Sequence, residues 1–276
     1  ILYVYYIVYI YMINTFSNLL TEINESKSLS VIRLGNVEAS QLLYKDGLYP
    51  KMMTNAGFFG DEDALKKWKG QMLEALMSAD CNLRVVTCRS FFVCDDVLTK
   101  LNLYIPTLPY VEELSFWISF INKMKTTSIG IISYFSEQMK SQSKIIDKVF
   151  NNKLKYTKSM DSFKFIFSEN TIQGNEPDNK TFEEVFDDLL QRSLKADCDV
   201  YLISCGCYGI PLCNELKKHG KRAVYVGGLL QLLFGLKGKR WDSREEINIH
   251  YNKYWKYPTK KPLNADLVEN SCYWGD

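Results

Sequence analysis

The sequence predicts an α/β protein of Rossmann-like architecture, in which a mostly parallel sheet carries helices on both faces. Short runs rich in Val, Ile, Leu, Phe or Tyr alternate with segments of helical periodicity, and several of these runs are bounded by glycine. Of the 276 residues, 46% are hydrophobic and 14% are aromatic, a composition that excludes a disordered chain. The net charge of +2 provides no extended basic surface, so we expect no nucleic-acid partner.

Six runs are predicted to be strands, because they are short, apolar and rich in β-branched or aromatic residues. They are residues 30–34, 83–88, 128–134, 163–168, 200–205 and 222–226.

The clearest predicted helix covers residues 182–195. Its apolar residues recur on one face, and Thr181 with Glu184 forms the capping-box pattern of a helix start. The same periodicity predicts helices at 63–77, 136–150 and 211–219. Residues 251–276 are aromatic and punctuated by proline, which indicates an irregular tail on the core.

The N-terminal segment 1–13 is apolar but shorter than the roughly 20 residues that a membrane-spanning helix needs. It lacks the basic start of a signal peptide, so we expect a cytoplasmic protein with at most peripheral membrane association at the inner face. Because the first methionine is Met12, we hypothesise that the protein begins there and that residues 1–11 are not part of it. We expect residues 14–276 to form a single domain.

Eight cysteines are too few for a disulfide scaffold in a chain of this length, and several lie in apolar runs. Cys205 and Cys207 are the only close pair, and the two histidines, His219 and His250, do not complete a tetrahedral zinc set. We therefore expect buried free thiols and no structural zinc.

In an open parallel sheet, ligands bind beyond the carboxyl ends of the strands, so the residues after each strand are the candidates for function. The first such end carries Arg33, Gly35, Asn36 and Glu38. Asn36 and Glu38 are oxygen ligands suited to a hard divalent cation, and Arg33 can hold a phosphate. The alternative is an ordinary turn with Asn36 as helix N-cap and Glu38 in the first helical turn.

The second strand end runs through Gly206, Tyr208 and Gly209 into a helix that contains Pro211. Backbone N–H groups at such a turn can bind an anion, and glycine allows a ligand to approach the main chain. The segment is neither a P-loop nor a dinucleotide fingerprint. A tight connection that needs glycine only for its backbone angles is the alternative.

The third end combines glycines with cations. Its candidate nucleotide-sugar ligands are Gly227, Gly228, Gln231, Lys237, Lys239 and Arg240. Flexible glycines beside three cations would let these side chains converge on a diphosphate. A solvated basic turn is the alternative.

These same residues resemble the GT-D-type glycosyltransferase-like family of bacterial surface-polysaccharide biosynthesis. The resemblance rests on segments 30–38, 55–59, 206–211, 226–241 and 268–274, and it extends over nearly the whole chain from residue 28. It implies a Rossmann-like domain that takes a sugar from a nucleotide sugar, with a metal near an Asp-x-Glu motif. Here Asn36 replaces that Asp, which removes one negative charge and puts metal dependence in doubt.

The resemblance implies transfer of a hexose from a nucleoside-diphosphate sugar to a glycan or lipid-linked acceptor. We hypothesise that Asn36 and Glu38 hold Mn²⁺ or Mg²⁺ on the diphosphate and that Asn55 contacts the nucleotide sugar. The leaving group would be neutralised by Arg33, Lys239, Arg240 and the turn at 206–209. The candidate catalytic acids are Glu38, Asp242 and Glu269.

Two other functions remain open from the sequence. The replacement of the motif's Asp by Asn36 favours a non-catalytic nucleotide-sugar-binding or scaffold subunit of a polysaccharide assembly. A phosphoester or nucleotide hydrolase is weakened by the lack of a second acidic cluster, because the adjacent Asp95 and Asp96 do not share a face.

Overall fold

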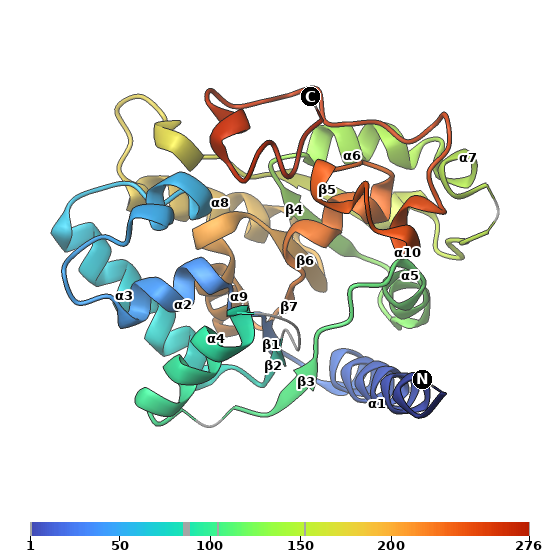
Figure 1. The fold of residues 1–276 in the computed structure, drawn as a ribbon, viewed down its shortest axis with the longest axis horizontal. Coiled ribbons are helices and arrows are strands. Elements are labelled where there is room, and N and C mark those ends of the chain that lie inside the picture. Colours follow the sequence, from blue (N-terminus) through green and yellow to red (C-terminus); the bar gives the residue numbers. More distant parts are fainter. Residues whose placement is uncertain (1, 85–88, 104, 152, 276) are drawn as a thin grey trace.

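A computed structural model describes residues 2–84, 89–103, 105–151 and 153–275. One seven-stranded, all-parallel sheet runs through it in the order β3-β2-β1-β7-β6-β4-β5 (Figure 1). The strands are β1 Leu29–Ile32, β2 Cys81–Arg84, β3 Thr107–Pro109, β4 Ile129–Ser133, β5 Phe163–Phe167, β6 Val200–Ser204 and β7 Arg222–Tyr225. The predicted open α/β class is confirmed.

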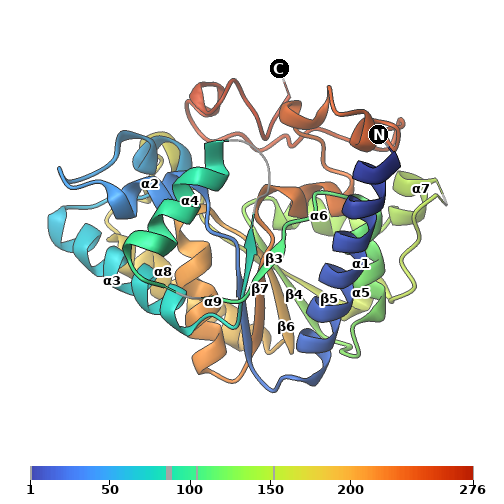
Figure 2. The same ribbon diagram turned by 60° about the horizontal axis from the view of Figure 1, so that its bottom comes forward.

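Helices pack against both faces of the sheet, as Figure 2 shows. One face carries α1 Leu2–Glu25, α5 Leu114–Lys123, α6 Ser136–Ser143 and α7 Ile146–Phe150. The other carries α2 Asn36–Leu43, α3 Glu62–Ser78, α4 Arg89–Lys100, α8 Phe182–Ala196 and α9 Gly209–Lys218. Successive residues of a strand point to opposite faces, so Val31 belongs to the first apolar core and Ile32 to the second.

Most predicted elements are confirmed with small shifts of their ends. In α8 the Thr181 hydroxyl accepts the backbone N–H of Glu184 at 3.2 Å, and the Glu184 carboxylate accepts that of Thr181 at 2.8 Å, which is the expected capping box. The strand predicted at 83–88 begins two residues earlier, and its positions 85–88 lie outside the described residues.

Two predictions about elements were wrong. The helix predicted over 136–150 is broken between α6 and α7, where the hydroxyl of Ser143 donates to the carbonyl of Lys140 and competes with the helical pattern. The set of six predicted strands also lacks the edge strand β3, which is only three residues long and ends in Pro109.

The connections reverse direction between β4 and β6. After β4 the chain passes through α6 and α7 to β5 at one edge, whereas after β6 it passes through α9 on the opposite face to β7. The carboxyl ends at such a reversal leave a crevice, which is the expected place for a ligand.

The chain after β7 folds over this crevice. It contains the 3₁₀ helices η5 Gly227–Phe234, η6 Lys239–Trp241 and η7 Ala265–Leu267 and the short α10 Glu245–Asn248. The expected irregular C-terminal tail is confirmed, and it lies across the carboxyl end of the sheet (Figure 2). Among the helices of the described residues, none is long and apolar enough to cross a membrane.

Candidate functional site

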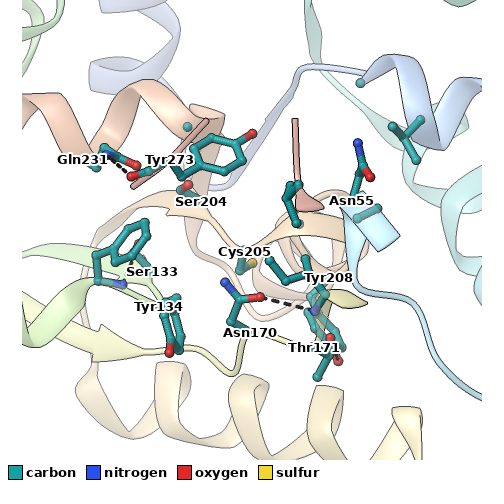
Figure 3. A pocket seen from close by; sticks show the side chains of 18 of the residues that line it. Asn55, Ser133, Tyr134, Asn170, Thr171, Ser204, Cys205, Tyr208, Gln231 and Tyr273 are labelled. Carbon is teal, nitrogen blue, oxygen red and sulfur yellow. Dashed lines mark hydrogen bonds between the residues drawn. The ribbon is translucent and has the colours of Figure 1, made fainter. Parts of the chain in front are cut away.

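A cavity of about 270 Å³ lies at the carboxyl ends of the central strands (Figure 3). Residues from the ends of β1, β4, β5, β6 and β7 line it together with the C-terminal tail. The predicted site residues that line it are Arg33, Gly35, Asn36, Glu38, Asn55, Gly206, Tyr208, Gly228, Gln231, Arg240 and Glu269. The fold thus brings most of the predicted residues to one cavity.

Arg33 is the cation enclosed by the cavity wall. It directly follows β1, and its guanidinium carbon lies 5.0 Å from the ring centre of Tyr110 and 5.8 Å from that of Tyr225. The Tyr110 hydroxyl donates to the carbonyl of Val226 at 2.9 Å, which fixes that ring. The Nε of Arg33 is buried without a hydrogen-bond partner among the described residues. A buried donor of this kind is costly unless a ligand satisfies it.

Gly227 makes room for this guanidinium. Its φ is +73°, a conformation that side chains disfavour, and a Cβ at this position would overlap the guanidinium of Arg33. Gly227 therefore allows the Arg33 guanidinium to take its place, although Gly227 itself does not line the cavity.

Glu38 is buried at the start of α2, where Gly35 is the N-cap and Asn36 is the first helical residue. The alternative expectation that Asn36 caps the helix is therefore wrong. The Glu38 carboxylate folds back onto Gly35, where a Cβ would overlap it. Burial raises the pKa of Glu38, while a hydrogen bond from its own backbone N–H and the charge of Arg33 oppose this rise.

The Gly206 turn is held tightly against its neighbours. Gly206 has φ +55°, and a Cβ there would overlap the carbonyl oxygen of Ala56. The hydroxyls of Tyr208 and Thr171 lie 3.0 Å apart, and Thr171 donates to the carbonyl of Gly57. These contacts position the neighbouring Asn55 at the cavity wall.

Arg240 forms the exposed rim of the cavity. Its Nη1 donates to the hydroxyl of Tyr273 at 3.1 Å, and its guanidinium stacks 5.3 Å from the ring of Trp241. Gln231 is buried, and its Nε2 donates to the carbonyl of Tyr273 at 3.1 Å (Figure 3). The same Nε2 donates to the carbonyl of Lys237 at 2.6 Å. In this arrangement Gln231 anchors the rim.

The tail segment beside this rim has an unusual backbone. Glu269, Asn270 and Ser271 have φ values of +47°, +55° and +62°, which non-glycine residues adopt rarely. The Glu269 carboxylate accepts from Nδ2 of Asn55 at 3.4 Å. This contact joins the tail to the opposite wall of the cavity.

The remaining predicted residues do not line the cavity: Gly209, Gly227, Lys237, Lys239 and Asp242. The Lys237 amine lies 4.8 Å from the ring centre of Tyr251 and 5.3 Å from that of Tyr257, whose hydroxyl donates to Asp242. A Cβ at Gly209 would overlap the Tyr225 ring, and Lys239 is exposed.

One wall of the cavity was not predicted. It is formed by Ser133 and Tyr134 at the end of β4 and by Glu169, Asn170 and Thr171 after β5 (Figure 3). The strand-end rule applied to the other strands would have found these residues, because the expected strands at 128–134 and 163–168 end there.

In the part of the chain that the structure describes, no three His, Cys, Asp or Glu side chains are grouped to hold a metal ion. The seven cysteines described are buried and free. Comparisons with family models, with curated proteins and with solved structures each find no match for this chain.

Proposed function

We propose that this chain is a glycosyltransferase that moves a hexose from a nucleoside-diphosphate sugar to a glycan or lipid-linked acceptor. One observation carries the proposal: Arg33, a cation with a buried and unpartnered Nε, faces a cavity at the carboxyl ends of the strands. An anion of the size of a diphosphate satisfies such a group. The resemblance of the strand-end segments to the GT-D-type family supplies the reaction class.

In this proposal the basic wall binds the leaving group. Arg33 and Arg240 neutralise charge that develops on the diphosphate as the glycosidic bond breaks, and backbone groups of the Gly206 turn approach the same anion. Arg33 is already held by two tyrosine rings, so little reorganisation is needed when the ligand binds. Of the candidate acids, Glu38 and Glu269 line the cavity, and the proposal does not use Asp242.

A divalent cation fits this cavity only together with the diphosphate. Asn36 and Glu38 both line the wall, and they would hold the ion as an amide and a single carboxylate, with phosphate oxygens completing its coordination. The Glu38 carboxylate is folded onto the start of α2 and faces the charge of Arg33. Mn²⁺ or Mg²⁺ would supply charge neutralisation on the diphosphate.

The first test is the melting temperature of the full chain with UDP, GDP, CMP and their sugars, each with and without Mn²⁺. A ligand that binds only the folded state raises the melting temperature by mass action. We expect a rise with one diphosphate nucleotide, and uridine or guanosine alone serves as the control without phosphates. No rise with any nucleotide would contradict the proposal.

Catalysis is tested separately by release of free sugar from the nucleotide sugar that binds. Release at a rate above that of the donor in buffer supports a transferase with water as a slow acceptor. Binding without release, also in the presence of crude glycan acceptors, favours a non-catalytic nucleotide-sugar-binding subunit instead.

A further inference from the structure

The walls of the cavity differ in charge. Arg33 and Arg240 lie on the wall formed by the β1 end and the C-terminal tail, together with the carboxylates of Glu38 and Glu269. The opposite wall, at the ends of β4, β5 and β6, contributes the carboxylate of Glu169 and no cation among the described lining residues. Lys260 lies 4.9 Å from the ring centre of Tyr134, but it is exposed and does not line the cavity. Among the described lining residues the cations therefore lie on the first wall alone, so that a diphosphate finds its ion-pair partners there and not at the second wall.

Glu169 is a half-buried carboxylate whose side chain has no hydrogen-bond or ion-pair partner among the described residues. Its charge acts on the neighbouring hydroxyl of Tyr134, because the pKa of Tyr134 is raised first by burial and then by Glu169. Tyr134 and the Glu169 carboxylate thus lie near one another on the wall of the cavity.

The residue next to Glu169 provides a complementary donor. The Asn170 Oδ1 accepts the backbone N–H of Ile172 at 3.2 Å, so the orientation of the amide is fixed and its nitrogen is turned away from this bond (Figure 3). A carboxylate acceptor beside an amide donor suits a neutral molecule with several hydroxyl groups. The aromatic ring of Tyr134 lines the same wall.

We propose that Glu169 binds hydroxyl groups of the transferred sugar and selects neutral hexoses against sugars that carry a carboxylate. This inference rests on the proposed function, because it takes the diphosphate to lie on the arginine wall. The Glu169 carboxylate accepts hydrogen bonds from sugar hydroxyls, whereas a uronic acid in the same place would bring two negative charges together. Glu169 is then a specificity-determining residue, with Asn170 beside it.

The test measures dissociation constants for UDP, UDP-glucose and UDP-glucuronic acid by calorimetry on the full chain. If the melting experiment selects GDP, then GDP, GDP-mannose and GDP-mannuronic acid replace them. We expect the neutral sugar to bind about tenfold more tightly than the acidic one, because the repulsion between two carboxylates is avoided. Glu169→Gln should reduce this ratio to about threefold or less while the affinity for the nucleotide alone stays the same.

Glu176→Gln is the matched control, because Glu176 is an exposed glutamate on the same loop and does not line the cavity. It should leave all three affinities unchanged. An unchanged neutral-to-acidic ratio in Glu169→Gln would overturn the inference and leave the proposed function standing.

Two further outcomes also count against the inference. If Glu169→Gln changes the affinity for the nucleotide alone as much as that for the sugar nucleotide, Glu169 acts at the diphosphate. If the wild-type chain binds neither UDP nor GDP, the proposed function fails and this inference fails with it.

Discussion

Arg33 and Arg240 line the same cavity but are held in different ways. Arg33 is enclosed between the rings of Tyr110 and Tyr225, directly after a central strand, and its Nε is buried. Arg240 lies on the short helix η6, is exposed to solvent, and is held by a hydrogen bond to the hydroxyl of Tyr273.

The difference indicates two electrostatic roles in one site. An enclosed cation is screened weakly by salt and acts at short range with fixed geometry, whereas an exposed cation is screened and acts mainly on the approach of the ligand. We therefore expect affinity to depend mostly on Arg33 and the salt dependence of association mostly on Arg240. The predictions below test this division.

The largest effect is expected from Arg33→Lys. Lysine keeps the charge but loses the planar fork that stacks on the two rings, and its ammonium is more strongly hydrated. We expect affinity for the nucleoside diphosphate to fall by about 10- to 100-fold, the equivalent of hydrogen bonds to a charged group. Isothermal titration calorimetry measures this, with circular dichroism to verify the fold, and undiminished affinity would remove Arg33 from the ligand site.

A smaller effect is expected from Gly227→Ala, which displaces the Arg33 guanidinium without removing it. Gly235→Ala is the matched control, because both glycines have φ +73° at the two ends of η5, and a Cβ at Gly235 meets Val149 instead. Both variants should lose roughly 1–3 kcal/mol of folding stability. Only Gly227→Ala should also lose nucleotide affinity, and equal affinities in the two variants would show that Arg33 need not be held in place.

The smallest effect is expected from Arg240→Ala. Affinity should fall about threefold or less at moderate salt, as for an exposed charge pair. The association rate measured by stopped-flow fluorescence should depend less on NaCl concentration than in the wild-type chain. A loss of affinity as large as that in Arg33→Lys would contradict the division of roles between the enclosed Arg33 and the exposed Arg240.

The sequence predicted the sheet well because parallel strands buried on both faces leave a strong pattern. Six of the seven strands were expected, and β3 was missed because a three-residue edge strand ending in proline carries no periodicity. The break between α6 and α7 was missed because the apolar residues keep helical spacing across it, and spacing does not report the side-chain hydrogen bond of Ser143 at the end of α6.

Prediction of the site depended on where the chain places each charge. Arg33 and Glu38 were found because they follow a central strand directly, and strand ends converge at one edge. Lys237 was assigned to the diphosphate because glycines flank it. Its amine instead makes cation–π contacts with the rings of Tyr251 and Tyr257, and the sequence around Lys237 does not show these partners. Glu169 was overlooked because only three strand ends were searched, although Glu169 directly follows the expected strand at 163–168.

The contact between Asn55 and Glu269 joins residues 214 positions apart in the chain. Contacts of such sequence separation form late in folding, because the entropy of closing a long loop must be met before they contribute stability. The pairing of β1 with β7 at the centre of the sheet spans a similar separation, since Leu29 pairs with Arg222. We therefore expect the central sheet and the rim formed by segment 268–274 to be completed in the same late phase of folding. Ligand affinity would then report the closure of the central sheet and of the cavity together.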